Sequence, residues 1–344
     1  MKALVIKGIE DVDVKEIPMP EVGKDEVLIK IKACALCTYE QRAYVGEKKA
    51  KFPFLGGHEI SGVVEKIGAN VDPDEFPIGQ KVSGRTQVAC GTCYHCRRGE
   101  YELCEHLSDY RYNGLDCYGF GGTAEYIALN KSQVFPYHGD LSFEEMALTE
   151  PVACVLNSVA IADPKLGDDA LVIGGGIMGQ LHLMLLKARG CRTILSEPDE
   201  ERRKFALARG VDICIDPTSE DLHQRIKELT SGNGVETLIN TTAIPSVEQD
   251  AISLVANRGT LVTYSSQHPD SPVSFSPNWL HNSEARLTGS VNPSIKSFNQ
   301  AVEVLSKGII KVDGLVSKVF TMDEGKEAFE AALKKNTYRV VIRI

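Results

Sequence analysis

The 344-residue sequence lacks any uninterrupted hydrophobic run approaching the roughly 20 residues needed to cross a membrane. Its first residues become charged after a few hydrophobic positions and lack the long hydrophobic core of a signal peptide. Positive charge is in deficit, because the net charge is −9, and this disfavours a nucleic-acid-binding surface. Internal repeats and low-complexity linkers are absent as well. We therefore expect a cytoplasmic protein whose partners include neither a membrane nor a nucleic acid.

The length and the cysteine content set the next expectations. The chain exceeds one typical domain, so two domains with separate cores are expected. A composition of 43% hydrophobic and 25% charged residues is ordinary for a globular protein. Four of the ten cysteines fall within residues 90–104. Because thiols stay reduced in the cytoplasm, such a cluster more often binds metal than forms disulfides.

The cysteine-rich stretch CGTCYHCRRGEYELC contains Cys90, Cys93, Cys96 and Cys104 in the spacing C-x2-C-x2-C-x7-C. Four thiolates close a tetrahedral zinc shell and leave no position for substrate, so such a site would be structural. An iron–sulfur cluster is an alternative for three cysteines at two-residue gaps, although the fourth cysteine departs from that pattern. Scattered core thiols are the other alternative. The spacing favours a structural zinc lobe over about residues 88–106.

The pattern of hydrophobic residues changes along the chain. Up to about residue 150 it favours strands, including 27–36 and 60–68. From about residue 169 strands and helices alternate, which is typical of a parallel sheet with helices on both faces. The predicted order is strand 170–176, helix 177–190, strand 193–198, helix 200–210, strand 236–240, helix 246–259 and strand 260–266. Helices at 294–308 and 324–335 and a strand at 339–344 follow. We therefore predict an α/β chain in which a Rossmann-like, doubly wound domain (154–291) is inserted between two parts (1–153 and 292–344) of another, mainly β domain.

A glycine motif lies at the start of the predicted Rossmann-like domain. Gly174, Gly176 and Gly179 form G-x-G-x-x-G directly after a hydrophobic strand and at the start of a helix. The first glycine allows a tight turn, the second a close approach to pyrophosphate, and the third close helix–strand packing. The pyrophosphate would rest on the free amides of this helix start, where Ile177 and Met178 complete the loop. The motif predicts dinucleotide binding, with a purely structural turn as the alternative.

An acidic residue supports the same prediction. Glu197 ends the next strand, 18 residues after Gly179, where a carboxylate would bond the ribose hydroxyls. Its charge would repel the 2′-phosphate of NADP, so NAD is the expected coenzyme. Arg202 and Arg203 follow on the next helix and keep NADP as the less favoured alternative.

A second group of possible metal ligands lies in the first part of the chain. Cys37 ends a predicted strand, His58 and Glu59 occur in GGHEISGVVEKIGANV, and Glu150 precedes a proline near the domain junction. Each residue is unremarkable alone. A packed thiol, a hydrogen-bonded core imidazole and surface carboxylates are the simpler interpretations.

The whole chain resembles a zinc-dependent medium-chain dehydrogenase of the alcohol, sorbitol and threonine dehydrogenase group. The motif G-H-E-x2-G-x5-G-x2-V, the four-cysteine lobe, VIGGGIMG and TEPVACVLNSV occur in the order and spacing of that family, at 57–71, 90–104, 172–179 and 149–159. The resemblance implies a GroES-like catalytic domain, a Rossmann coenzyme domain and a catalytic zinc in the cleft between them. It also implies two zinc ions per chain and a homodimer or homotetramer.

The resemblance assigns roles to the second group of residues. Cys37 and His58 would be ligands of the catalytic zinc, and Glu59 and Glu150 occupy the two acidic positions that complete the shell in related polyol and threonine dehydrogenases. Such a zinc would bind the substrate hydroxyl and lower its pKa, so that hydride passes from the alkoxide carbon to nicotinamide. Glutamate at position 150 resembles the sorbitol branch more than the liver alcohol branch.

The chain departs from the family directly after the first ligand. The usual Cys-Gly-Ser/Thr-Asp-x-His is replaced by Cys-Thr-Tyr-Glu-Gln-Arg, so that Tyr39 stands for the small hydroxyl and Arg42 for the histidine. Two interpretations of Tyr39 are open: a catalytic hydroxyl that relays the proton, or an aromatic wall, with solvent or Glu59 carrying the proton. Arg42 and the lysines that follow it would either receive a phosphorylated substrate or form a solvated loop, and the loop is the expectation; the lysines are Lys48, Lys49 and Lys51.

The sequence thus predicts a zinc- and NAD-dependent enzyme that oxidises a secondary alcohol of a polyol, cyclitol or sugar derivative. An NADPH-dependent aldehyde or ketone reductase on the same scaffold is the alternative enzyme. From another class, the cysteine lobe would suit a non-catalytic zinc-ribbon redox sensor.

Overall fold

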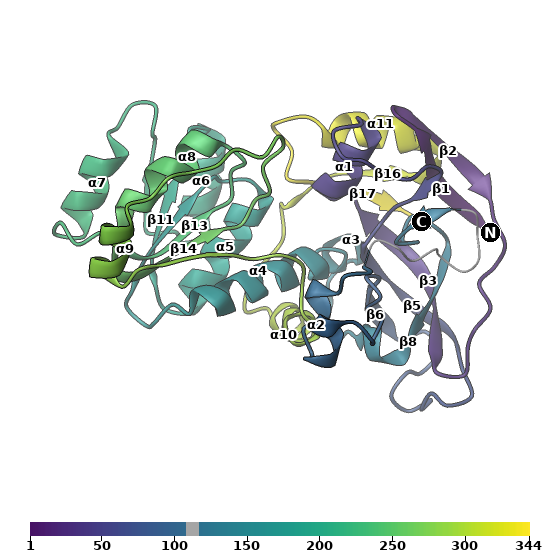
Figure 1. Ribbon diagram of the computed structural model, residues 1–344. Coiled ribbons are helices and arrows are strands. Elements are labelled where there is room, and N and C mark those ends of the chain that lie inside the picture. Colours follow the sequence, from purple (N-terminus) through teal and green to yellow (C-terminus); the bar gives the residue numbers. More distant parts are fainter. Residues whose placement is uncertain (108–116) are drawn as a thin grey trace. The chain divides into compact units, whose positions relative to one another are not determined.

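The computed structural model describes residues 1–107 and 117–344 of the chain (Figure 1). It divides into two compact units. The first comprises Met1–Ala153 and Pro293–Ile344, and the second comprises Cys154–Asn292. The second unit is therefore an insertion in the sequence of the first.

The first unit is built around a sheet of strand order β16-β17-β3-β5-β6-β9, with β8 also paired to β3. The bounds are β3 (Glu26–Ala35), β5 (Glu59–Ile67), β6 (Lys81–Arg85), β8 (Tyr126–Asn130), β9 (Val134–Pro136), β16 (Val316–Thr321) and β17 (Arg339–Arg343). A smaller sheet has the order β2-β1-β4-β7, with β1 (Lys2–Gly8), β2 (Asp11–Glu16), β4 (Phe54–Leu55) and β7 (Tyr118–Gly119). The buried hydrophobic residues of β3, β5 and β8 form the core of this unit.

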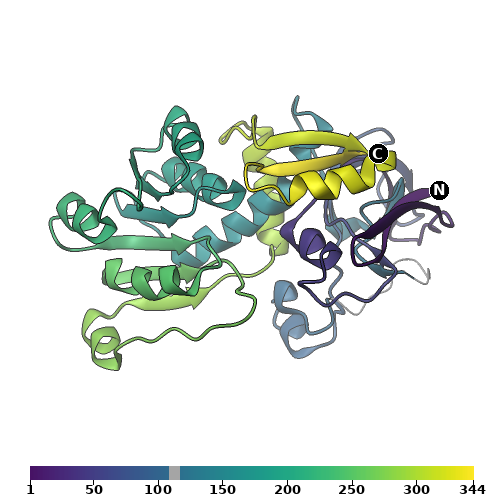
Figure 2. The ribbon, with the colours of Figure 1, turned by 90° about the horizontal axis from the view of Figure 1, so that it is seen from above.

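The helices of the first unit are α1 (Thr38–Tyr44), α2 (Tyr94–Arg97), α3 (Phe143–Met146), α10 (Ile295–Ser306) and α11 (Gly325–Ala332), and of these α3 and α11 pack on strands of its sheets. The C-terminal segment lies beside the N-terminal strands (Figure 2). Phe329 of α11 stacks on Tyr44 of α1 with the ring centroids 4.6 Å apart. Strand β17 pairs antiparallel with β3, so a chain end far away in sequence reaches the strand that leads to Cys37.

The second unit has a parallel sheet of order β12-β11-β10-β13-β14-β15. Its strands are β10 (Asp169–Ile173), β11 (Arg192–Ser196), β12 (Ile213–Ile215), β13 (Val235–Asn240), β14 (Val255–Thr263) and β15 (Arg286–Gly289). Its helices are α5 (Ile177–Ala188), α6 (Glu200–Ala208), α7 (Leu222–Leu229), α8 (Pro245–Ala251) and α9 (Pro277–Ser283). This is the Rossmann order, in which ligands bind where the strand order reverses, here between β10 and β13.

One predicted helix ends earlier than the sequence pattern indicates. The helix expected over 246–259 stops at Ala251, and after a 3₁₀ turn the chain enters β14 at Val255. Val255 aligns with Val235 of β13, and this parallel pairing buries it. Long-range strand pairing therefore overrides a local pattern that favours a helix.

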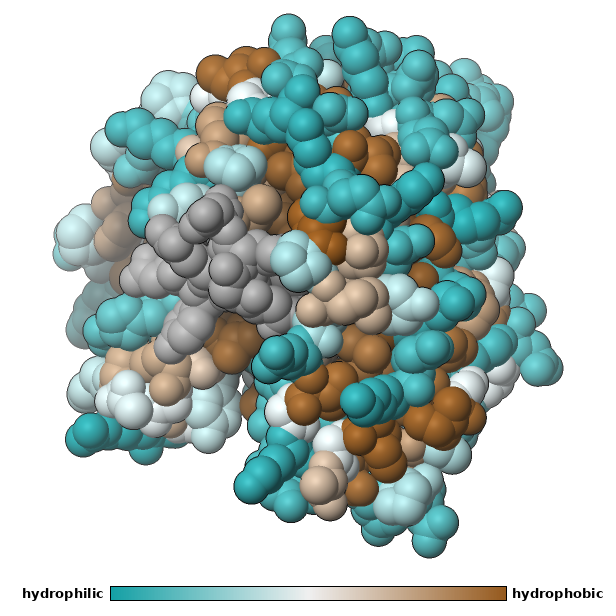
Figure 3. All heavy atoms as spheres, turned by 90° about the vertical axis from the view of Figure 1, so that its right-hand side faces the viewer, coloured by the Kyte–Doolittle hydropathy of each residue, from teal (hydrophilic) through white to brown (hydrophobic). Residues whose placement is uncertain are grey.

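One segment is long and hydrophobic enough to span a membrane by length and composition alone. It covers Phe143–Ala162, which includes α3 and α4 (Thr149–Ala162). Within the most hydrophobic part of this segment, 72% is buried inside the protein, as expected of a core helix. On the face of the protein drawn in Figure 3, hydrophobic residues form separate groups among hydrophilic ones.

Candidate active site and metal centres

Three possible metal ligands of different chemistry meet inside the first unit. Cys37 lies between β3 and α1, His58 directly precedes β5, and Glu59 is the first residue of β5. The antiparallel pairing of β3 with β5 sets Ala35 opposite Glu59, which brings the two strand ends together. The thiol, imidazole and carboxylate ligand atoms all lie within 4.8 Å of one another. This ligand set suits a catalytic zinc.

The orientation of His58 is set by Glu40, which is fully buried in α1. Glu40 Oε1 accepts hydrogen bonds from the His58 ring at Nδ1, 2.8 Å away, and from the Gly57 amide, 3.0 Å away. Burial lowers the pKa of His58, but the charges of Glu40 and Cys37 outweigh it and raise the pKa well above its usual value. With Nδ1 bonded to a carboxylate, Nε2 is left to bind a metal, as in carboxylate–histidine–zinc arrangements.

Glu59 is held by a residue from the far end of the sequence. Arg339, the first residue of β17, donates from Nη2 to Glu59 Oε1 at 2.5 Å, and both side chains are buried. Among the residues that the structure describes, Glu59 Oε2 is buried without a hydrogen-bond partner. Burial raises the pKa of Glu59 to about 7, although Arg339 opposes this shift. A cation bound by Cys37 and His58 would satisfy this unpaired oxygen, so the residues present fit a zinc ion.

Glu150 is not among the three residues whose ligand atoms meet. It is buried in the first turn of α4, 6% exposed, and its charge raises the pKa of Glu59. It therefore lies near enough to act electrostatically on the cluster, but the structure brings together only Cys37, His58 and Glu59 from the predicted ligand set.

Tyr39 forms part of an aromatic wall beside His58. Its ring centroid lies 5.3 Å from that of Phe120, 6.0 Å from that of Phe54 and 6.2 Å from that of His58. Burial, and secondly the charge of Glu40, raise the pKa of Tyr39. The ring contacts with Phe54, Phe120 and His58 favour the wall interpretation.

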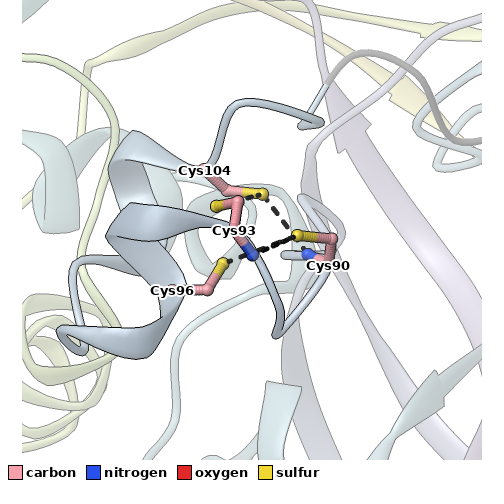
Figure 4. A group of neighbouring side chains, drawn as sticks. All are labelled: Cys90, Cys93, Cys96 and Cys104. Carbon is pink, nitrogen blue, oxygen red and sulfur yellow. Dashed lines mark hydrogen bonds between the residues drawn. The ribbon is translucent and has the colours of Figure 1, made fainter.

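The four-cysteine lobe forms a separate, closed cluster (Figure 4). The Cys90 and Cys96 sulfurs are 3.9 Å apart, as are those of Cys93 and Cys104, and all four lie within 4.8 Å of one another. Sulfurs bound to one tetrahedral zinc at about 2.3 Å would be about 3.8 Å apart. The Thr92 and Cys93 amides donate to the Cys90 sulfur, and the Thr92 amide is the largest cause lowering its pKa to about 6. The spacing and the stabilised thiolate fit a structural zinc.

The glycine loop between β10 and α5 has the shape that its motif predicts. Gly174 has a φ of +95°, and a Cβ there would lie 2.7 Å from Thr241 Oγ1. A Cβ on Gly179 would lie 1.9 Å from the Gly174 carbonyl oxygen. Gly176, which precedes α5, faces open space, and no side chain caps the amides that follow it. Ile177 and Met178 open the helix at this point, so the loop leaves room for a pyrophosphate.

Glu197 lies against this loop, directly after β11. Its carboxylate accepts from the Gly175 amide at 2.5 Å and from the Asp199 amide at 2.9 Å, and the side chain is buried. Arg202 lies 3.8 Å from this carboxylate, whereas Arg203 donates to the Glu197 carbonyl and pairs with Asp216. Of the two arginines considered from the sequence, Arg202 therefore lies nearer to the expected ribose position.

A polar network at the ends of β13 and β14 was missed by sequence reasoning. Glu248 is buried and accepts hydrogen bonds from Asn240 at 2.5 Å and from Thr263. Thr241, the next residue after β13, donates to the Gly174 carbonyl at 3.1 Å. The signal available in the sequence was the polar run that follows the hydrophobic strand at 236–240. The network braces the glycine loop from the adjacent strand.

Comparisons with known proteins agree with this geometry. The sequence profile described as "Alcohol dehydrogenase GroES-like domain" matches residues 23–139, and that described as "Zinc-binding dehydrogenase" matches residues 178–307. D-arabinitol dehydrogenase 1 of Uromyces fabae is 29% identical over 348 residues, which cover 100% of this chain and 97% of that protein. D-arabitol-phosphate dehydrogenase of Enterococcus avium is 27% identical, over 97% of this chain and 94% of that protein.

A solved structure shares the same fold over the full length. A candidate zinc-binding dehydrogenase of Sinorhizobium meliloti 1021, crystallised with NADP, superposes with a TM-score of 0.89 at 25% identity. The match covers 100% of this chain and 99% of the other. The similarity thus extends over both units and is not confined to the glycine motif.

Proposed function

Because this chain belongs to the zinc-dependent medium-chain dehydrogenase/reductase family, we propose that it oxidises a secondary alcohol of a polyol, cyclitol or sugar derivative with NAD. The observation that carries the proposal is the cluster of Cys37, His58 and Glu59, in which Glu59 Oε2 is buried and has no hydrogen-bond partner among the described residues. Polyol dehydrogenases among the relatives support the substrate class.

The chemistry follows from the roles of this chain's own residues. Zinc, when bound at the cluster, supplies a Lewis acid that lowers the pKa of the substrate hydroxyl. Glu40 keeps His58 in the orientation in which its Nε2 could bind zinc. Tyr39 and Phe120 line the position beside His58. The glycine loop binds the coenzyme pyrophosphate, and Glu197 bonds the ribose hydroxyls.

Zinc content and coenzyme reduction together test the proposal. Purified protein should contain about two zinc ions per chain, one for each cluster. It should reduce NAD when incubated with members of a panel of polyols, cyclitols and sugar derivatives. Two zinc ions without reduction of either coenzyme by any alcohol would refute the substrate class. The zinc-ribbon sensor considered from the sequence is set aside, because the chain belongs to a family of dehydrogenases.

An NADPH-dependent aldehyde or ketone reductase is the second candidate. It is favoured by Arg202, which lies 3.8 Å from Glu197, and by the NADP bound in the Sinorhizobium meliloti structure. Initial rates of aldehyde and ketone reduction with NADPH and NADH, set beside alcohol oxidation with NAD, would separate the two functions. A cytoplasmic location and a homodimer or homotetramer complete the proposal.

Coenzyme choice should depend on Glu197. In the Glu197→Ser variant the ratio of kcat/KM for NADP to that for NAD should rise about 10- to 100-fold, because Arg202 would then meet the 2′-phosphate. Absolute rates with both coenzymes should fall, since Glu197 also holds the Gly175 amide. The control is Glu200→Ser on the exposed face of α6, which should leave the ratio unchanged. A wild-type enzyme that already prefers NADP would contradict the role of Glu197.

Tyr39 provides a second, smaller test. If the ring serves as a wall, Tyr39→Phe should keep turnover within about threefold of the wild type and leave the pH profile of kcat unchanged. A fall of about 10²-fold or more, with a displaced pH profile and unchanged KM, would instead establish the hydroxyl as a proton relay. Steady-state kinetics across pH distinguish these outcomes.

A further inference from the structure

One lysine of the loop after α1 is less exposed than the solvated loop predicted from the sequence. Lys48 is half-buried, and its Nζ lies 3.8 Å from the Tyr39 ring centroid. The backbone holds the loop in place, because the Lys48 amide donates to the Arg42 carbonyl at 3.1 Å and the Gly46 amide donates to Ala43 at 3.3 Å. The loop therefore folds back along α1 and places an ammonium group over the aromatic wall.

The ammonium group of Lys48 has no anionic partner among the described residues and could bind an anion. Among the described residues no side-chain hydrogen bond or ion pair involves its ammonium group, whose contact is the Tyr39 ring. Burial and the charge of Arg42 lower the pKa of Lys48, while the charges of Cys37 and Glu40 raise it. A partly buried ammonium with unused donors is stabilised when an anion binds it.

The other lysines of the loop do not share this position. Lys49 is exposed, and Lys51 is exposed with its Nζ 5.2 Å from the Tyr118 ring. Tyr39 contacts both Lys48 and the wall beside His58, so Nζ and the His58 ring are no farther apart than the sum of their distances to the Tyr39 centroid, 3.8 Å and 6.2 Å. A substrate of a few carbons can span that separation.

We propose that Lys48 determines specificity by binding an anionic group, a phosphate or a carboxylate, carried by the alcohol substrate a few carbons from the hydroxyl that is oxidised. This inference rests on the proposed function, because it places the reacting hydroxyl at the cluster of Cys37, His58 and Glu59. The Tyr39 ring stabilises the ammonium group through a cation–π contact and leaves its N–H groups available as donors to an anion.

The test compares a pentitol with its terminal phosphate ester and with the corresponding pentonate, using the zinc- and NAD-loaded enzyme. Wild-type kcat/KM should favour at least one anionic substrate over the neutral pentitol. Lys48→Gln should lower kcat/KM for that anion about 10- to 100-fold, mainly through KM, and change the neutral substrate less than about threefold. Lys48→Arg should retain the preference, and the exposed Lys49→Gln should behave as the wild type. Higher ionic strength should weaken the preference of the wild type and not of Lys48→Gln.

The remaining outcomes separate this inference from the proposed function. Wild-type turnover of neutral pentitols that equals or exceeds turnover of both anions would overturn the role of Lys48 and leave the dehydrogenase intact. Equal losses for neutral and anionic substrates in Lys48→Gln would also overturn it, since they would indicate a structural role. If no alcohol were oxidised, the role of Lys48 would be tested by measuring the binding of the pentitol phosphate by calorimetry. Binding that Lys48→Gln abolishes would support the anion site, and binding that it leaves unchanged would overturn it.

Discussion

Replacement of His58 by alanine should lower kcat/KM for alcohol oxidation by about 10³-fold or more. The imidazole is one of the three possible metal ligands that meet in the cluster of Cys37, His58 and Glu59, and Glu40 holds it in place. Loss of a ligand releases the metal or distorts its shell, and a Lewis acid contributes several kcal/mol to such a reaction. About 4 kcal/mol corresponds to a factor of about 10³ in rate.

Metal analysis should accompany the kinetics of His58→Ala. The variant should keep the zinc of the four-cysteine lobe and lose the other, so its zinc content should fall to about one ion per chain. His223→Ala is the matched control, because this histidine is exposed in the second unit and pairs with Asp250. A His58→Ala enzyme with wild-type turnover would show that the cluster is not the catalytic metal site.

Replacement of Arg339 by methionine should produce the largest loss of stability. Arg339 and Glu59 are 3% and 0% exposed, and the substitution leaves the carboxylate buried without its partner. Removing one partner of a buried ion pair costs about 3–5 kcal/mol. The test uses metal-depleted protein, in which no zinc charge compensates Glu59. The midpoint of unfolding should shift to a markedly lower denaturant concentration or temperature.

Two further variants make the Arg339 experiment specific. Arg343 lies on the same strand as Arg339 but is exposed, and it pairs with Glu144 of α3. Arg343→Met should lower the free energy of unfolding by less than about 1 kcal/mol. Adding Glu59→Gln to Arg339→Met should restore part of the lost stability, because no charge is then left unpaired. If the two single arginine variants unfolded at the same temperature, the buried pair would contribute nothing specific.

Pairing over long sequence distances explains why Arg339 escaped prediction. The residue is 280 positions away from Glu59 in the sequence, and only the antiparallel pairing of β17 with β3 brings it to the cluster. Glu40 is visible in the sequence as part of Cys-Thr-Tyr-Glu-Gln-Arg, but its bond to His58 depends on where α1 places this side chain relative to the residue that precedes β5. The helix expected over 246–259 failed for a related reason, since pairing with β13 recruits Val255 into a strand.

The family, the α/β fold class and the local motifs could be inferred from the sequence alone. The four-cysteine lobe and the glycine loop can be identified from residue spacing, because each is a short continuous segment whose residues are close in sequence as well as in space. The pairing of charges in the cluster and the partial burial of Lys48 became visible only in the folded chain. Burial makes an unpaired charge costly, so partners such as Arg339 and Glu40 are required there, but which residues fill those places depends on how distant strands and helices pack.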